Sequence, residues 1–223
     1  MLGLYRVLEA VTSSHPEVLF ESCSGGGGRF DAGMLYYMPQ TWTSDDTDAM
    51  ERLKLQWGTS IVYPASAMGA HVSAVPNHQV MRTTPLNTRG LVAMGGNFGY
   101  ELDLSAQSPE DLEVMRQQIA LIKQIRHTTA RGTFTRLASP FEGNLTAWSF
   151  RDEDELLLFV FRTMSLPMEL PPVVRLRDIP EGTCWQDEDG TVYTAATLMG
   201  PGLRLMKLPR GDFSAVLYRL KKV

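Results

Sequence analysis

The chain has 223 residues, of which 43% are hydrophobic and 21% charged, and its formal net charge at pH 7 is −4. These values are typical of a globular protein with one or two domains and a buried core. The acidic balance and the lack of a long Lys/Arg run argue against a nucleic-acid partner, and no window reaches the ~18 apolar residues that span a membrane.

Two features of the chain bear on where it works. Cys23 and Cys184 lie in unrelated surroundings, which favours free thiols in a reducing, cytoplasmic setting over a disulfide framework. The N-terminal segment has no long apolar core, so a signal peptide is not expected. Helical periodicity starts at Leu2 with no preceding cap, and we therefore expect the chain to begin inside a larger fold.

Strand and helix patterns alternate over the first 130 or so residues. Strands are expected at 18–20, 40–43, 60–64 and 98–104, and helices at 2–13, 34–38, 48–57, 86–94 and 109–126. The last helix has a strong start signal, with Ser108 as N-cap and Pro109 in the first turn. A (β/α)8 barrel needs eight strand–helix units and about 250 residues, so four units predict half of a barrel.

From Gly132 onward the pattern changes to short alternating or apolar runs separated by Pro, Gly and acidic turns. Strands are expected at 145–150, 155–163, 173–177, 191–195, 203–208 and 214–220. Asp189-Gly190 predicts a tight hairpin turn, because such turns need residues that tolerate positive φ. We therefore predict a catalytic half-barrel over residues 1–131 and a separable antiparallel β-sandwich domain over residues 132–223.

A glycine-rich loop follows the first expected strand, in the run Glu21-Ser22-Cys23-Ser24-Gly25-Gly26-Gly27-Gly28-Arg29. Consecutive glycines let the backbone amides come close to a ligand. A phosphate loop and a flexible linker are the alternatives. The Gly-Lys-Ser/Thr and spaced-glycine phosphate signatures are absent, and the glycines follow a strand directly.

An acidic loop follows the second expected strand, in the run Trp42-Thr43-Ser44-Asp45-Asp46-Thr47-Asp48. Acidic residues are common in the first turn of a helix, and we assign Asp48 and Asp46 to that role. Asp45 lies closest to the strand end, beside Trp42. An aromatic ring next to a carboxylate is typical of a sugar site, because rings stack on sugar faces and partial burial raises an acid's pKa.

These blocks, with YPASAMGAHVSAVPNHQ and TRGLVAMGGNFGYELDL after them, resemble the bacterial family 36 α-galactosidases in order and spacing over residues 3–130. The resemblance implies a retaining hydrolase of terminal α-galactosides such as melibiose and raffinose, with no cofactor. It implies that Asp45 is the acid/base and that Cys23, Gly26 and Trp42 border the galactose pocket. The family's nucleophile belongs to a Lys-Trp-Asp motif, which is absent from this sequence, so the chain is expected to lack a nucleophile. A missing N-terminal half or a second copy is the expected partner.

Other candidates and functions stay open. His71 and His78 do not have the spacing of a zinc motif, and structural hydrogen bonding fits them better than metal binding. Glu101 and Asp103 are expected to bind loop backbone rather than act as a catalytic pair. The alternative functions are a non-catalytic carbohydrate-binding or assembly protein, and a related activity such as α-N-acetylgalactosaminidase or galactosyl transfer.

Overall fold

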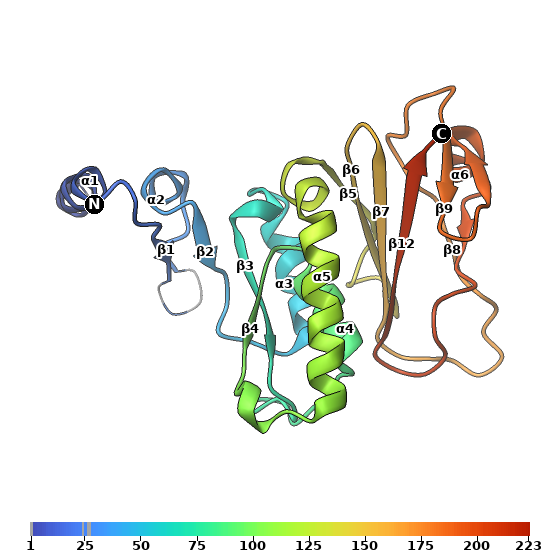
Figure 1. Cartoon of the computed structure of the whole chain (residues 1–223), viewed down its shortest axis with the longest axis horizontal. Helices are drawn as coiled ribbons and strands as arrows, with labels where there is room; N and C mark the ends of the chain where they lie inside the picture. The colour runs from blue at the N-terminus through green and yellow to red at the C-terminus, as the bar shows by residue number, and fades with distance from the viewer. Residues whose placement is uncertain (1, 24, 26–27) are drawn as a thin grey trace.

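The computed structural model describes residues 2–23, 25 and 28–223, and Figure 1 shows two layers of sheet with helices between them. Its first part alternates strands and helices: α1 (Leu2–Ser14), β1 (Glu21–Ser22), α2 (Ala32–Tyr37), β2 (Gln40–Trp42), α3 (Ala49–Thr59), a 3₁₀ turn η1 (Ala65–Ala67), β3 (Met68–Ser73), α4 (Leu86–Ala93), β4 (Asn97–Glu101), a 3₁₀ turn η2 (Leu104–Ala106) and α5 (Pro109–Arg131).

The four strands of this part form one parallel sheet in the order β1-β2-β3-β4. In strand β3 the side chains of Ala70 and Val72 point to one face, where they pack in a cluster with Leu86 and Met115 of the covering helices. The side chains of His71 and Ser73 therefore point to the opposite face, which Gly69 leaves open, because side chains alternate along a strand. Sequential parallel strands with helices on one face match half of a (β/α)8 barrel, as predicted.

Two of the expected strands are placed differently in the structure. The run 60–64 is a turn that ends α3, with the N–H of Ile61 bonded to the carbonyl of Gly58 (3.1 Å), and Val62 is 72% exposed. The third strand is instead Met68–Ser73. The first expected strand, 18–20, is shifted along the chain: the residues that pair are Glu21–Ser22, and the preceding Leu19 is 86% exposed.

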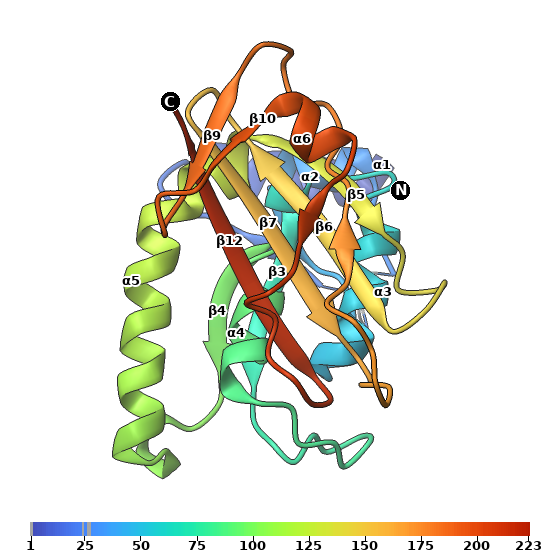
Figure 2. The same ribbon diagram turned by 90° about the vertical axis from the view of Figure 1, so that its right-hand side faces the viewer.

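The second part is antiparallel, and Figure 2 shows its main sheet face-on. Its elements are β5 (Thr133–Ala138), β6 (Leu145–Arg151), β7 (Glu155–Arg162), β8 (Val173–Val174), β9 (Cys184–Asp187), β10 (Val192–Thr194), α6 (Ala195–Met199), β11 (Leu203–Arg204) and β12 (Ser214–Lys222). Six strands form a sheet in the order β10-β9-β12-β7-β6-β5, and β8 and β11 form a separate pair. The sequence analysis missed β5 and β9. The Asp189-Gly190 turn is confirmed, since it joins the antiparallel strands β9 and β10 with Gly190 at φ 85°.

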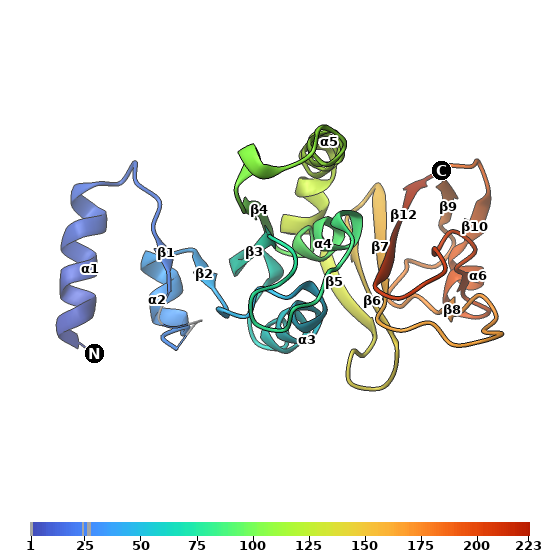
Figure 3. The ribbon, with the colours of Figure 1, turned by 90° about the horizontal axis from the view of Figure 1, so that it is seen from below.

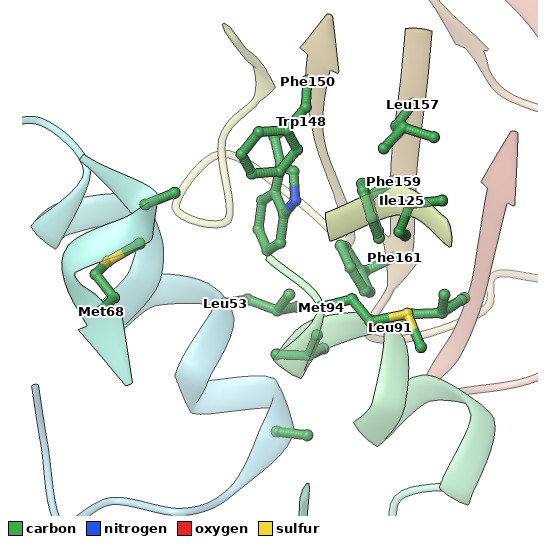
Figure 4. Close-up of a cluster of buried hydrophobic side chains, with 14 of the residues drawn as sticks. Leu53, Met68, Leu91, Met94, Ile125, Trp148, Phe150, Leu157, Phe159 and Phe161 are labelled. Atoms are coloured by element: carbon green, nitrogen blue, oxygen red, sulfur yellow. The ribbon is translucent and has the colours of Figure 1, made fainter. Parts of the chain in front are cut away.

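The six-stranded sheet has a hydrophobic core on each face. One face packs with β8, β11 and α6 around Trp185, Leu158 and Leu220. The other face packs against α3, α4 and α5, which lie between the two sheets (Figure 3). Figure 4 shows this second core, in which Trp148, Phe150 and Phe161 meet Leu53 and Met94 of the half-barrel. The two parts of the chain therefore share one core.

This shared core changes what is expected of residues 132–223 when they are expressed alone. Trp148, Phe159 and Phe161 are 0–1% exposed in the whole chain and would face water in the fragment. We expect the isolated fragment to bind a hydrophobic dye more strongly than the whole chain and to aggregate. Cooperative unfolding of the fragment at the same temperature as the whole chain, without dye binding, would show that the domain is separable after all.

A polar cluster also joins the two parts at the end of α5. The hydroxyl of Thr128 donates to Asp152 Oδ2 (2.6 Å), and the N–H of Glu155 donates to Asp152 Oδ1 (2.8 Å). Burial opposes the charge of Asp152, but these hydrogen bonds outweigh it and hold the pKa of that carboxyl below its ordinary value.

A carboxyl whose pKa is lower in the folded state stabilises the fold above its unfolded pKa, and the contribution is lost as pH falls through the folded pKa. Asp152→Asn should therefore lower the free energy of unfolding at pH 7 by about 1–3 kcal/mol, and the difference should disappear in acid. Thermal unfolding from pH 7 down to about pH 3 would measure this. Asp154→Asn is the matched control, because the Asp154 side chain is exposed. A deficit that persists in acid would assign the effect to packing.

Candidate active site

The ends of β1 and β2 meet at one edge of the parallel sheet. Ser22 is paired with Thr41, and Trp42 with Gly69 of β3, so the segments after these strands leave the sheet side by side. Cys23 comes directly after β1 and is an exposed, free thiol. Gly26 lies outside the described residues. The carboxyl ends of parallel strands form the active-site face of α/β barrels, which places Cys23 and the acidic loop on that face.

The three carboxylates of the acidic loop have different surroundings. Asp48 is 2% exposed, caps α3 by accepting from the N–H groups of Met50 (3.0 Å) and Glu51 (3.1 Å), and forms an ion pair with Arg82. Asp46 Oδ1 accepts from the N–H of Asp48 (3.0 Å). Both residues therefore hold the start of the helix, as predicted from the sequence.

Asp45 is exposed and takes no part in capping. Its Oδ1 accepts a hydrogen bond from Trp42 Nε1 (3.1 Å), and its backbone carbonyl accepts from Gln79 Nε2 (3.3 Å) on the loop after β3. Among the described residues no other hydrogen bond reaches the Asp45 carboxyl group. One carboxyl oxygen is thus held, and the other is available to a ligand at the mouth of the sheet.

Trp42 lies beneath Asp45 and is only 9% exposed. Its indole stacks on the ring of His71, with centroids 4.6 Å apart and an interplanar angle of 15°, and the guanidinium of Arg52 lies 4.5 Å from the indole centroid. Arg52 is buried and donates to the carbonyls of Ser44 (3.1 Å) and Gly69 (2.7 Å). Burial lowers the pKa of Arg52 to about 10, so the guanidinium stays positively charged at neutral pH.

His71 and Glu101 belong to this site, although the sequence analysis placed His71 in a loop. His71 Nδ1 lies 3.3 Å from Glu101 Oε2 at the end of β4. A Cβ on Gly99 would lie 3.0 Å from His71 Cδ2, so the glycine leaves room for the imidazole. Asp103 binds loop backbone as expected, accepting from the N–H of Ser105 (2.8 Å). The alternation of residues in β3 could have predicted that His71 faces inward if the strand had been placed correctly.

The two histidines weighed in the sequence have other surroundings than a metal cluster. Among the described residues, no group of three or more His, Cys, Asp or Glu side chains could hold a metal ion. His78 lines a cavity of about 230 Å³ that Glu101 and Ser73 also line.

In the part of the chain that the structure describes, no helix is both long and apolar enough to cross a lipid bilayer.

Three other carboxylates among the described residues are each bonded to a neighbouring group. Glu21 accepts a hydrogen bond from Gln40, Glu101 contacts His71, and Asp31 caps α2 by accepting from the N–H of Met34 (2.8 Å). The arrangement supplies one carboxyl group that can give and take a proton. A retaining glycosidase uses a pair of catalytic carboxyl groups about 5–5.5 Å apart.

Comparison with known proteins agrees with this geometry. The family model described as Melibiase matches residues 1–132, and the Glycosyl hydrolase family 36 C-terminal domain matches residues 145–220. The chain is 53% identical to alpha-galactosidase AgaA of Geobacillus stearothermophilus and 42% identical to alpha-galactosidase Mel36A of Lactobacillus acidophilus. Each match covers 100% of this chain and 31% of the relative.

Solved structures give the same result. The crystal structure of AgaA superimposes with a TM-score of 0.96 at 53% identity, and the galactosidase domain of the α-galactosidase–sucrose kinase AgaSK with 0.96 at 44%. Each superposition covers 100% of this chain and 31% of the solved one. Variants of AgaA have been solved in complex with raffinose and with stachyose. The chain thus spans about a third of the length of these relatives.

Proposed function

Because the chain belongs to the melibiase family of glycoside hydrolases, we propose that it is the acid/base-bearing portion of a retaining α-galactosidase. The single observation that carries this proposal is the position of Asp45. It is an exposed carboxyl at the C-terminal edge of the parallel sheet, with one oxygen held by Trp42 (3.1 Å) and the other open. The substrate class is a terminal α-galactoside of the raffinose and melibiose type.

The proposed reaction has two steps with a covalent intermediate. Asp45 gives its proton to the glycosidic oxygen as the bond from C1 to that oxygen breaks, and the leaving sugar departs as an alcohol. A nucleophilic carboxylate supplied by the rest of the enzyme forms the new bond to C1. Asp45, now ionised, then takes a proton from water while the water oxygen attacks C1 and releases the enzyme carboxylate.

This chemistry requires a second carboxyl group about 5–5.5 Å from the first. The family's Lys-Trp-Asp motif is absent from the 223 residues, so we propose that a complementary N-terminal portion, corresponding to the remaining length of AgaA, supplies the nucleophile. The test is hydrolysis of raffinose by the chain joined to that portion of AgaA. Binding of galactose without hydrolysis would favour the carbohydrate-binding alternative.

We further propose that Cys23 and the glycine loop that contains Gly26 contact the galactosyl group. Cys23 is exposed and free at the end of β1, and β1 pairs with β2, which leads into the acidic loop. Galactose at millimolar concentration should slow alkylation of Cys23 in the assembled enzyme. Cys184, which lies on β9 in the antiparallel sheet, is an internal control and should react at an unchanged rate. Equal rates at Cys23 with and without galactose would contradict the assignment.

The two free thiols also support a reducing compartment, and we propose a cytoplasmic location. Labelling both thiols in freshly lysed cells under non-reducing conditions tests this. A disulfide to either cysteine in the native protein would contradict it.

A further inference from the structure

The role of Trp42 follows from how its indole is surrounded. An aromatic platform for a sugar needs a free ring face, but Trp42 is only 9% exposed. His71 is stacked on the ring at 4.6 Å, and the Arg52 guanidinium lies 4.5 Å from its centroid. Joining the chain to the rest of an enzyme can only reduce the exposed area further. The indole N–H, and not the ring face, is therefore directed at the acidic loop.

We propose that Trp42 is a positioning residue for Asp45 and that its N–H selects which carboxyl oxygen handles the proton. Trp42 Nε1 lies 3.1 Å from Asp45 Oδ1. An indole N–H can only donate a hydrogen bond, so Oδ1 accepts, and the contact favours the acidic proton on Oδ2, because the carbonyl oxygen of a carboxylic acid is a better acceptor than its hydroxyl oxygen. The proton of Asp45 is then on Oδ2, which gives it to the glycosidic oxygen and later takes it back from water.

A support beneath the indole keeps this N–H aimed at Asp45. His71 holds the ring by stacking and is itself fixed by Glu101, with Nδ1 and Oε2 3.3 Å apart. Gly99 provides the space for the imidazole, since a Cβ there would lie 3.0 Å from His71 Cδ2. Arg52 ties the loop to β3 through the carbonyls of Ser44 and Gly69. We extend the positioning role to His71, which acts through the stack and touches no substrate.

This inference rests on the proposed function only for its kinetic test, because the hydrogen bond can be measured in the chain itself. The four tryptophans give four indole N–H resonances in a ¹⁵N–¹H spectrum, and the Trp42 signal is the one missing from Trp42→Phe. Asp45→Ala should move that signal and leave the other three in place. Asp46→Asn, one residue along, should not move it. An unchanged Trp42 signal in Asp45→Ala would overturn the proposal.

The kinetic test uses the chain joined to the N-terminal portion of AgaA. Trp42→Phe keeps an aromatic ring but removes the donor, and it should reduce kcat on raffinose about ten- to hundredfold. On an activated aryl α-galactoside, whose leaving group needs little protonation, the loss in formation of the galactosyl-enzyme should be several-fold smaller. Trp57→Phe is the matched control: this tryptophan lies on α3, packs against the shared core and does not bond Asp45, so the change should be neutral on both substrates. Equal losses for Trp42→Phe on both substrates would show a merely structural role.

A second pair of variants tests the support. His71→Ala removes the stacked ring and should reproduce the selective loss on raffinose, whereas His71→Phe keeps a flat ring in the space above Gly99 and should restore most of the rate. Similar losses in both variants would contradict the stacking role. The failure of this inference can be told apart from the failure of the proposed function. If Asp45→Asn leaves raffinose hydrolysis intact, the proposed function fails. If Asp45→Asn loses the activity but Trp42→Phe does not, only this inference is overturned.

Discussion

In an enzyme assembled from this chain and the missing N-terminal portion, Asp45→Asn is expected to lower kcat on raffinose by about 10²–10⁴-fold, the usual contribution of general acid catalysis. The asparagine has the same size and can still accept from Trp42 Nε1, so the loop geometry should survive. What it lacks is a proton to give to the leaving oxygen and a carboxylate to take one from water.

The leaving group decides how the loss is distributed between the two steps. An activated aryl α-galactoside departs without protonation, so its first step should be nearly normal and the galactosyl-enzyme should accumulate, giving a burst of the aryl product. Azide needs no general base, and adding it should restore turnover by attacking C1 of that intermediate.

Asp46→Asn is the matched control, because Asp46 binds the N–H of Asp48 at the helix start. It should behave like the unsubstituted enzyme and show neither the burst nor the azide response. A loss of equal size on both substrates, or a larger loss at Asp46 than at Asp45, would mean that the acid/base has been misassigned.

The acidic loop could be predicted from the sequence better than the residues that support Trp42. The resemblance to family 36 implied the acid/base role of Asp45, whereas the acidic run between a strand and a helix predicted a helix cap, which the structure confirms for Asp48. Helix capping has a strong local signal, because the first turn leaves N–H groups that a carboxylate can accept from. Asp45 lies outside this cap, and its carboxyl group is bonded to Trp42 instead.

The support beneath Trp42 could not be predicted in the same way. The true third strand, Met68–Ser73, contains Gly69 and Ala70, which favour strands weakly, whereas the nearby run 60–64 is β-branched and aromatic. Strand preference depends on the neighbours that a strand packs against, and those are set by the parallel sheet. Misplacing this strand put His71 in a loop and hid its stacking on Trp42.

The shared core between the two parts could not be predicted from the sequence pattern either. Strands β6 and β7 are apolar on both faces, as in Trp148 and Phe159 on one side and Ala147 and Leu158 on the other. Such a run indicates burial on both faces but not which elements cover each. Only the three-dimensional arrangement shows that α3, α4 and α5 cover one of them.

The second large effect concerns the chain by itself, which should have no measurable α-galactosidase activity. The Lys-Trp-Asp motif that carries the family's nucleophile is absent from its 223 residues, so Asp45 is expected to have no nucleophilic partner carboxylate. Without a nucleophile the reaction loses its covalent intermediate, which divides one difficult step into two easier ones. The edge strands β1 and β4 of the four-stranded sheet are also unpaired on their outer sides among the described residues, which leaves room for further strands.

The most direct measurement is therefore an assay of the purified chain with an activated aryl α-galactoside, alone and after refolding with the N-terminal portion of AgaA. The account predicts no turnover by the chain alone and turnover by the assembled pair. It also predicts that Asp45→Asn in the pair lowers the rate of raffinose hydrolysis by about 10²–10⁴-fold. Robust turnover by the 223-residue chain alone, lost in Asp45→Asn, would contradict the account and show that a nucleophile lies within these residues.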